Sequence, residues 1–252
     1  TNWFDAYGRV IQQYLPYTDN LETGNFRTNP ATQQPAFYNT YFSNTESFYY
    51  STAVYENSPL NRVLMQTAPG KTWGGNNKGV RALSRTNRLA EDVRMFTIAA
   101  AIASVPQYTG LYSAGELIVT KTTDEQDNKV IEYKERNGLV VLKKVQATNI
   151  LQDGHTGWLC TYYVYDDFRR LRYVIPPKAV EWMAIPANSW NLSSNATVQN
   201  ELCFRYEYDG EGRMIIKKVP GAGEVWMVYD GRDRLVMTQD AKLRTQTTQQ
   251  WM

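Results

Sequence analysis

The stretch YDGEGRMIIKKVPGAGEVWMVYDGRDRLVMTQD, residues 208–240, contains one phrase twice. The phrase reads Tyr-Asp, two variable residues, Gly or Asp, Arg and an apolar residue, and its two copies start at Tyr208 and Tyr229. A phrase that returns after twenty-one residues is typical of a repeat, in which each unit is one small structural element. The copies therefore indicate a rule for building the chain rather than a single reactive site.

The chemistry of the phrase predicts a β-hairpin. FRYEY and VWMVY, the runs that lead into Asp, are rich in β-prone residues. Asp favours the start of a turn because its carboxylate accepts hydrogen bonds from backbone N–H groups. Gly212 then supplies a positive φ that closes a loop of about three to four residues, and the apolar run after Arg returns as the partner strand. A proline after this run ends the ladder, because it has no N–H to donate.

Further copies start at Phe4, Tyr55, Tyr133 and Tyr165, and the copy at Tyr55 carries an insertion. Similarity at a period near twenty residues predicts an architecture in which each unit buries its apolar surface against its neighbours. In one copy, Asp209 and Arg213 flank the loop closely enough to pair, which contributes about 0–1 kcal/mol if the pair is exposed. The residues predicted to build the turns are Asp5, Gly8, Arg9, Asp166, Asp209, Gly212, Arg213, Asp230 and Arg234.

Two copies depart from the rule. In the copy at Tyr165, Arg169 stands at the glycine position, where a left-handed backbone is costly for a non-glycine residue. We therefore expect the turn over residues 166–170 either to be of a different type or to be locally strained. In the copy at Tyr133, Lys134 replaces Asp and Gly138 arrives one residue late, which predicts a loop that is one residue longer.

The expected fold class is mainly β: an antiparallel, curled sheet of such hairpins with one short helical segment near residues 178–200. This segment follows Pro177 and has apolar residues at helical spacing before Pro186. The other expected features are a hairpin over 1–16, a loop-rich crossing over 17–54 with one or two strands near SFYYSTAVY, a flexible loop over 73–79 (WGGNNKG), strands near 92–98, 115–122, 129–136 and 139–146, and a turn over 122–128. We expect two regions that are continuous with each other, 1–150 with degenerate repeats and 151–252 with clear Tyr-Asp repeats.

Composition excludes some classes of partner. The 252 residues include 18 Tyr, 8 Phe and 7 Trp but one His, and the formal net charge is +2. Acidic and basic residues are interleaved, so no basic stripe indicates a nucleic-acid partner. The pairs Lys143-Lys144 and Lys217-Lys218 are expected at solvated strand edges. The longest apolar run, residues 95–105, is shorter than the roughly 20 residues that a membrane span needs.

The phrases YDGEGRM, YDGRDRLV, YDDFRRLRYVIPP and FDAYGRV resemble the YD repeats of bacterial RHS (rearrangement hot spot) proteins, whose unit reads roughly Tyr-Asp-x-x-Gly-Arg-(Leu/Val). The stretches SPLNRVLMQTAPGKTW, GELIVTKTTDEQDNKVIEYKERNGLVVLKK and LCFRYEYD look like the region just upstream of the repeats in large secreted RHS-type proteins. The likeness spans nearly the whole chain and is weak between residues 17 and 54.

In the family that these residues resemble, the repeats form long, curled antiparallel strips that wind into a hollow shell around a C-terminal toxin or effector domain. The resemblance implies that the chain is a non-enzymatic wall segment of such a shell, secreted or at the cell surface, with no catalytic residue, no metal and no cofactor. Its implied partners are further YD repeats and a C-terminal cargo domain of the same polypeptide. Because the chain opens inside a copy of the phrase and contains neither the family's self-cleaving aspartyl core nor its toxin domain, we expect it to be a fragment. A dimer of the fragment through open edge strands stays an alternative.

A surface module that binds carbohydrate or protein is the second hypothesis. Its ligand would contact exposed aromatic side chains, although stacking across neighbouring strands also explains them; the candidates are Tyr38, Tyr41, Phe48, Tyr49, Tyr50 and Trp73. A hydrolase is the third hypothesis, and it would need two carboxyl groups that face each other. The acid pairs Asp124-Glu125 and Asp166-Asp167 fit turns better, because sequence neighbours on a strand point to opposite faces.

The remaining candidates are one histidine and two cysteines. His155 lies in the loop-like stretch LQDGHTGW and has no second histidine with which to hold zinc, so we expect it to be solvated. Cys160 and Cys203 each stand five residues before a repeat tyrosine and would face the same side of a sheet. A disulfide would require neighbouring strands, and the roughly 40 residues between the cysteines favour two separate core residues instead.

Overall fold

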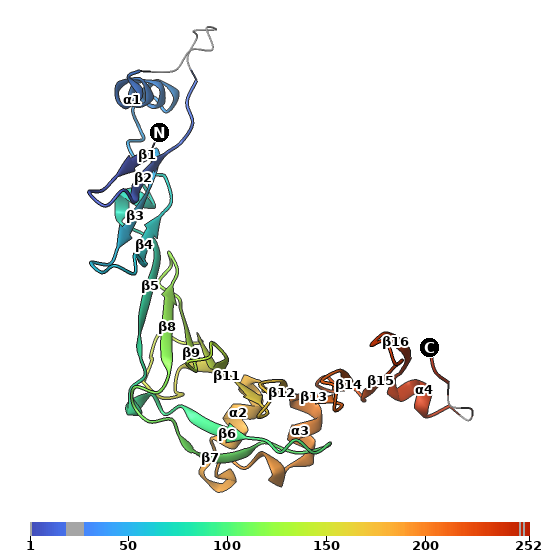
Figure 1. The fold of residues 1–252 in the computed structure, drawn as a ribbon. Helices are drawn as coiled ribbons and strands as arrows, with labels where there is room; N and C mark the ends of the chain where they lie inside the picture. Colours follow the sequence, from blue (N-terminus) through green and yellow to red (C-terminus); the bar gives the residue numbers. More distant parts are fainter. Residues whose placement is uncertain (1, 19–27, 247, 249) are drawn as a thin grey trace. The chain divides into compact units, whose positions relative to one another are not determined.

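The computed structural model describes residues 2–18, 28–246, 248 and 250–252 (Figure 1). Fourteen strands form one sheet in the order β1-β2-β3-β4-β5-β8-β9-β10-β11-β12-β13-β14-β15-β16, and β6 and β7 form a separate two-stranded sheet. Neighbouring strands of the large sheet follow each other along the chain except at β5 and β8, between which the chain forms β6 and β7. The predicted mainly β, antiparallel fold is confirmed.

The strands are β1 (Asn2–Phe4), β2 (Val10–Tyr14), β3 (Tyr50–Tyr55), β4 (Val63–Thr67), β5 (Gly79–Thr86), β6 (Arg94–Thr97), β7 (Gln107–Leu111), β8 (Ile118–Thr123), β9 (Lys129–Lys134), β10 (Val140–Gln146), β11 (Trp158–Tyr165), β12 (Leu171–Ile175), β13 (Phe204–Tyr208), β14 (Met214–Lys218), β15 (Val225–Tyr229) and β16 (Leu235–Gln239). The α-helices are α1 (Pro30–Tyr41), α2 (Pro177–Met183), α3 (Ala196–Leu202) and α4 (Ala241–Arg244). The predicted strands near 92–98, 115–122, 129–136 and 139–146 are confirmed, as is the hairpin within 1–16.

The chain divides into two compact units: unit 1 comprises residues 1–84 and 120–130, and unit 2 comprises residues 85–119 and 131–252. Each unit consists of residues that contact one another more than they contact the rest of the chain. The division at residue 150, which was based on how clearly the repeats read, stays a prediction.

Unit 1 contains a helix that the sequence did not predict. Part of the expected loop-rich crossing forms α1, which starts at Pro30 and contains Pro35. Its contacts are aromatic: the Tyr38 ring stacks on Tyr49 with 4.9 Å between the ring centroids, and the Tyr38 hydroxyl donates to the carbonyl of Pro16. The residues of α1 show no apolar stripe at helical spacing, so the helix depends on this tertiary packing rather than on a local pattern.

The glycine-rich stretch over 73–79 is not the flexible loop that we predicted. Gly74–Asn76 form a 3₁₀ turn, and Gly79 is buried at the start of β5. A Cβ atom at Gly79 would lie 2.4 Å from the carbonyl oxygen of Gln66 on β4, and one at Gly75 would lie 2.9 Å from the Phe48 ring. These glycines therefore allow close packing, which a count of small residues does not reveal.

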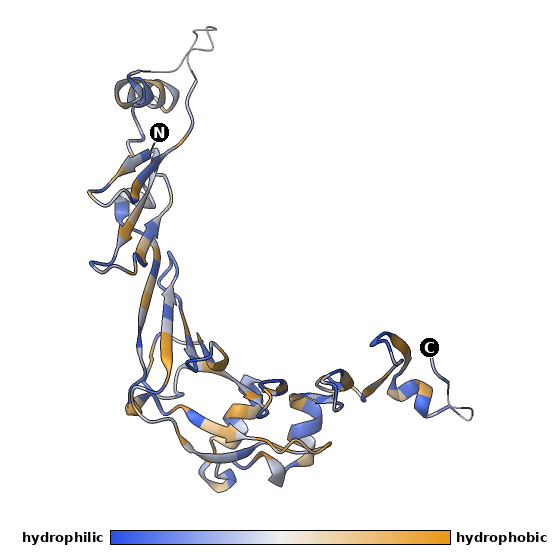
Figure 2. Ribbon diagram, in the orientation of Figure 1, coloured by the Kyte–Doolittle hydropathy of each residue, from blue (hydrophilic) through white to orange (hydrophobic). Residues whose placement is uncertain are grey.

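Unit 2 holds the main hydrophobic core. Its buried members include Val119, Ile131, Tyr133, Leu142, Tyr162, Tyr173, Ile175, Val180, Met183, Leu192 and Val198. The helices α2 and α3 confirm the predicted helical segment. Hydrophobic residues occur along α2 (Figure 2), and its Ala179, Val180 and Met183 are buried in this core. Cys160 on β11 and Cys203, which directly precedes β13, are buried and free, and β12 lies between these two strands, so the prediction of two separate core residues is confirmed.

The residues from Arg94 to Leu111 form a hairpin that we call the arm: β6, the connection over 98–106, and β7. The fully buried Arg172 on β12 donates to the carbonyl oxygens of Ala99, Ala100 and Ala101 and pairs with Glu207 on β13. Glu207 in turn accepts a hydrogen bond from the backbone N–H of Ala103 at 3.0 Å. The arm is thereby fastened over the repeat strands of unit 2.

The expectation that both lysine pairs lie at solvated edges is wrong for one member of each pair. Lys144 is fully buried and Lys218 is 7% exposed, because successive side chains on a strand point to opposite faces. The Lys144 ammonium donates to the carbonyl oxygens of Glu91 at 3.0 Å and of Asp153 and Gly154 at 2.8 Å. All three of its hydrogens thus have acceptors, which a buried ammonium requires.

Candidate functional site: the Tyr-Asp turns

Each Tyr-Asp phrase forms a hairpin turn that is closed by its own aspartate and arginine. Oδ1 of Asp209 accepts hydrogen bonds from the backbone N–H groups of Glu211 at 3.1 Å and Arg213 at 2.9 Å. Oδ2 accepts from Nε of Arg213 at 2.7 Å, which is the predicted ion pair. The same three contacts occur at Asp5 with Arg9, at Asp166 with Arg170 and at Asp230 with Arg234.

The residue before the arginine is in the left-handed region in every one of these turns. Its φ is +77° at Gly8 and +84° at Gly212, but also +63° at Arg169 and +60° at Asp233. The turn over 166–170 keeps the common hydrogen bonds, with the Arg169 N–H donating to the Asp166 carbonyl at 2.8 Å. Of the two alternatives predicted for this turn, local strain is therefore the correct one.

The longer loop predicted after Tyr133 is wrong. Glu135 takes the place of the aspartate: its N–H donates to the Leu139 carbonyl at 2.9 Å, and the N–H of Gly138 donates to the Glu135 carbonyl at 2.9 Å. The turn therefore has the common length and starts one residue later than the phrase suggested. In the turn after Tyr55 the predicted insertion is confirmed, because the N–H of Glu56 donates to the carbonyl of Arg62 at 2.9 Å, six residues on.

The turn over residues 122–128 is of the same type, although the sequence indicated only a turn there and not a copy of the Tyr-Asp phrase. Oδ1 of Asp124 accepts from the N–H groups of Gln126 at 2.9 Å and Asn128 at 2.8 Å, and Asp127 has a φ of +65°. Asn128 stands where the other copies have arginine. The signal that could have revealed this copy is the four-residue spacing from Asp124 to a polar side chain that bonds back to it.

In four of the phrases the tyrosine ties its hairpin to the one before. The Tyr208 hydroxyl donates to the carbonyl of Leu171 at 3.0 Å, and Leu171 directly follows the arginine of the preceding turn. The same bond joins Tyr229 to Met214 at 2.9 Å. The corresponding bonds of the other hairpins join Tyr55 to Val10 and Tyr165 to Val140, both at 3.1 Å.

In three of the turns the arginine contacts the next hairpin; these residues are Arg9, Arg170 and Arg213. Nη1 of Arg170 donates to the Asp209 carbonyl at 3.2 Å, and its guanidinium carbon lies 5.1 Å from the centre of the Tyr208 ring. In the next interval, Arg213 makes the corresponding contacts with the Asp230 carbonyl at 3.4 Å and with the Tyr229 ring at 5.4 Å. The first two hairpins show the same pair of contacts, from Arg9 to Glu56 and Tyr55. We call the tyrosine bond and these arginine contacts together the lateral clamp.

The lateral clamp covers the arginine side chain. Arg9, Arg170 and Arg213 are 18%, 20% and 24% exposed. The side chain of Arg234, in the turn between β15 and β16, is 68% exposed and keeps the bond to its own Asp230. A neighbouring hairpin therefore shields much of the arginine side chain from water. This shielding strengthens the contact between the guanidinium and the aromatic ring.

The hydrogen bonds of the turns favour ionised carboxylates. The Arg234 guanidinium and the N–H groups of Arg234 and Arg232 lower the pKa of Asp230 below its usual value. Partial burial acts to raise the pKa of Asp209, but the hydrogen bonds and charge of Arg213 outweigh it and lower the pKa. The Arg62 guanidinium and the Ser58 hydroxyl lower the pKa of Glu56 to about 2. These carboxylates serve as acceptors within their turns.

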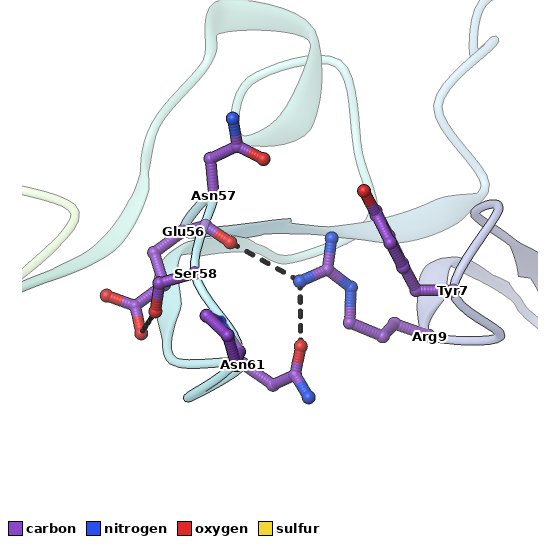
Figure 3. Close-up of a pocket in the computed structure, with 7 residues that line it drawn as sticks. Tyr7, Arg9, Glu56, Asn57, Ser58 and Asn61 are labelled. Atoms are coloured by element: carbon purple, nitrogen blue, oxygen red, sulfur yellow. Dashed lines mark hydrogen bonds between the residues drawn. The ribbon is translucent and has the colours of Figure 1, made fainter.

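A pocket of about 450 Å³ opens between the first two turns of unit 1 (Figure 3). It is lined by Tyr7, Arg9, Glu56, Asn57, Ser58, Pro59 and Asn61. Arg9 lies between Tyr7 and the second turn, where its Nη1 donates to the Glu56 carbonyl at 3.3 Å and to Oδ1 of Asn61 at 3.0 Å. The insertion after Tyr55 supplies the wall formed by Asn57, Ser58 and Pro59.

The other candidates lie apart from the turns or inside the protein. Tyr38 and Tyr49 are 6% and 8% exposed, so the predicted platform of exposed aromatic residues is wrong for these two. His155 is largely covered rather than solvated, because its ring contacts Asp92 and Tyr162. The acid pairs at 124–125 and 166–167 lie in turns, as predicted. Asp166, Asp209 and Asp230 each bond within their own turn.

Two searches cover the described part of the chain. Among those residues, no group of three or more His, Cys, Asp or Glu side chains is arranged to hold a metal ion. No helix within the same residues is both long enough and apolar enough to cross a membrane.

Comparisons with known proteins show a family match and a shared fold. Residues 1–86 match the family described as Domain of unknown function (DUF6443). No curated protein matches the chain. The fold is similar to a crystal structure of TcdB2-TccC3-TEV and to one of TcdB2-TccC3 without its hypervariable C-terminal region, each at 18% sequence identity and a TM-score of 0.53.

A Tc holotoxin pore from Photorhabdus luminescens that carries a substitution in TccC3 matches at 17% identity and a TM-score of 0.53. In each case the match covers 95% of this chain and 9% of the other chain. The chain therefore spans a small part of the length of the structures that it resembles. The first third of the chain thus matches DUF6443, and nearly the whole chain shares its fold with a segment of these Tc toxin components.

Proposed function

We propose that the chain is a wall segment of an RHS-type β-shell, built from YD repeats, whose complete polypeptide encloses or presents a C-terminal effector domain outside the cell. The observation that supports this proposal most directly is the lateral clamp, because it is repeated between successive hairpins. The tyrosine, aspartate and arginine of the phrase would be exposed in a reactive centre. In this chain they close one turn and contact a neighbouring hairpin. The shared fold with segments of Tc toxin components supports the same role.

In this proposal the segment is not an enzyme and needs no cofactor. The aspartates that could act as acids or bases are each engaged by two backbone N–H groups and one arginine. A glycosidase would need two carboxyl groups facing each other across about 5–9 Å with room for substrate between them. Each turn carboxylate instead accepts a hydrogen bond from the arginine of its own turn.

The test uses the complete polypeptide that contains these residues. Its structure by electron cryomicroscopy is expected to show the sheet continued by further Tyr-Asp hairpins around a separate domain. The paired variant Arg213→Ala/Tyr229→Phe, which opens one lateral clamp, is expected to make that domain more sensitive to protease than Tyr206→Phe does. A polypeptide whose remaining domain lies outside the repeats, equally sensitive in both variants, would contradict the proposal.

The pocket of Figure 3 supports a second candidate function, the binding of a saccharide at the cell surface. The guanidinium of Arg9 lies 5.1 Å from the centre of the exposed Tyr7 ring, and Asn57 lines the same pocket; such a ring with a few polar groups around it is typical of small-ligand pockets. Glycan-array binding that is lost in Tyr7→Ala and kept in Phe168→Ala would support this candidate. No binding by the unmodified chain would eliminate it.

A further inference from the structure

The side chain of His155 is buried where several segments of unit 2 meet. It belongs to the connection between β10 and β11, and 15% of its side chain is exposed. Its Nε2 lies 2.9 Å from the hydroxyl of Tyr162 on β11, and its Nδ1 lies 3.4 Å from Oδ2 of Asp92 at the base of the arm. Its ring packs 4.9 Å from that of Trp190, between α2 and α3. One imidazole therefore contacts β11, the base of the arm and the helical segment.

The hydrogen bonds of Tyr162 assign the proton on this imidazole. The backbone N–H of Arg94 donates to the Tyr162 oxygen at 3.0 Å, so the single hydroxyl hydrogen is free to be donated to Nε2 of His155. Nε2 accepts it only when unprotonated, which leaves the ring proton on Nδ1 facing Asp92. Protonation of His155 would turn Nε2 into a donor and deprive a buried hydroxyl hydrogen of its acceptor, which is costly.

The charges around His155 also oppose a further positive charge. Lys144 on β10 holds the carbonyl oxygens of Asp153 and Gly154, the two residues before His155. Arg94 on the arm pairs with Asp92 at 2.6 Å and lies over the Trp190 ring at 4.5 Å. Two cations and one carboxylate therefore face the imidazole.

The remaining groups of the cluster do not change charge in acid. On β11, burial raises the pKa of Cys160 to about 11 and raises that of Tyr162 well above its usual value. On β7, the Tyr108 hydroxyl accepts a hydrogen bond from Arg94 at 2.9 Å. On the helical segment, the facing residue is Trp190, which does not titrate. Below neutral pH the charge in this cluster therefore changes through His155.

We propose that His155 is an acid-sensitive latch, whose protonation releases the base of the arm and Trp190 from β11. Burial, followed by the positive charge of Lys144, lowers the pKa of His155 to about 4, whereas a hydrated histidine titrates near about 6.5. The released state binds the proton more tightly, so the population of the released state relative to the latched state rises as the pH falls. The rise is about tenfold per pH unit between the two values, and the latch is fully closed above about pH 6.5.

The first test uses the fact that His155 is the one histidine of the chain. In the full chain labelled with ¹⁵N-histidine, NMR therefore follows a single imidazole through an acid titration. The expected result is an unprotonated Nε2 and a protonated Nδ1 at neutral pH, with a titration midpoint near pH 4. A midpoint near pH 6.5, or a ring proton on Nε2 at neutral pH, would overturn the proposal.

The second test measures release by hydrogen exchange. The Arg94 amide donates to the Tyr162 hydroxyl on β11, so its protection, corrected for intrinsic exchange, is expected to fall about tenfold per pH unit below pH 6.5, while amides of the β13–β14 hairpin keep theirs. His155→Gln, which does not titrate, is expected to abolish this pH dependence. An unchanged dependence in His155→Gln would contradict the latch.

A second variant keeps the test valid if His155→Gln does not fold. Tyr162→Phe removes the hydroxyl that stabilises the neutral imidazole, so the midpoint of His155 is expected to move upward from about 4. An unchanged or lower midpoint would show that the hydroxyl does not hold the neutral ring.

Discussion

The hydroxyl of Tyr208 donates a hydrogen bond to the backbone carbonyl of Leu171, 3.0 Å away in the preceding hairpin. This bond relates the first residue of one repeat phrase to the last residue of the phrase before it. It explains why tyrosine rather than phenylalanine suits the position: the ring packs beside an arginine, and the hydroxyl reaches a backbone acceptor. The phrase therefore encodes both a turn and the contact between successive turns.

Tyr208→Phe is expected to lower the free energy of unfolding by about 1 kcal/mol, because a partly buried hydrogen bond is lost while the ring stays. The matched control is Tyr206→Phe on the same strand, whose side chain points to the same face but does not bond to Leu171. Urea denaturation measures both variants. Equal effects of the two substitutions would show that the bond to Leu171 contributes nothing.

Asp209→Ala is expected to lower the urea midpoint at neutral pH, since it removes the acceptor of two backbone N–H groups and one guanidinium. Asp209→Asn keeps an acceptor for the backbone and loses the charge, so its effect should be smaller. Urea midpoints at pH 7 distinguish the two variants. The reverse order would contradict the role of the backbone hydrogen bonds.

The contribution of the Asp209 charge should depend on pH in a defined direction. Because its folded-state pKa is lowered, the stabilisation is fully present above the usual carboxyl value of about 3.9 and is lost as the pH falls through the folded-state pKa. Asp209→Asn should therefore lose less stability than the unmodified chain on acidification below pH 4. Denaturation midpoints between pH 6 and pH 3 measure this difference.

Arg169→Gly is expected to stabilise unit 2 by about 0.5–1 kcal/mol, because glycine adopts the φ of +63° without strain. The converse substitution Gly212→Ala, at a φ of +84°, is expected to destabilise by about 1 kcal/mol. Thermal unfolding measures both. A destabilised Arg169→Gly variant would show that the arginine side chain has a stabilising role that outweighs the strain.

Lys144→Met is expected to destabilise unit 2 by roughly 3 kcal/mol, since three buried carbonyl oxygens lose their donor. Its neighbour Lys143 provides the control, because Lys143→Met changes a side chain that is 39% exposed and should have an effect within about 0.5 kcal/mol. Chemical denaturation that gives similar values for the two lysines would contradict the burial of the Lys144 ammonium.

The turns and most hairpins could be predicted from the sequence because their determinants are local. Aspartate and an arginine four residues later fix each turn, with a glycine directly before the arginine in two of the four, and β-prone runs flank them. Local signals failed for α1, whose stabilising contact is the stacking of Tyr38 on Tyr49 across a connection, and for the arm, which Arg172 holds from a distant strand. The burial of His155 and Lys144 depends likewise on residues far along the chain, such as Asp92 and Glu91.

The lateral clamp was not predicted, although its residues were identified. The sequence shows that tyrosine and arginine recur, but it does not show that the hydroxyl of one phrase reaches the carbonyl that ends the phrase before it. That relationship depends on the register between neighbouring hairpins, such as Tyr173 opposite Arg205. Register follows from pairing across the sheet and lies outside any single repeat.

The most direct test of the account is a double-mutant cycle on Arg170 and Tyr208, the two side chains that join successive turns. With Arg170→Ala and Tyr208→Phe, urea denaturation is expected to give a coupling free energy of about 0.5 kcal/mol or more, because both residues serve one clamp. The matched cycle on Arg170 and Tyr229, which belong to different clamps, should give a coupling near zero. Equal coupling in the two cycles would contradict the claim that the recurring phrases hold neighbouring hairpins together.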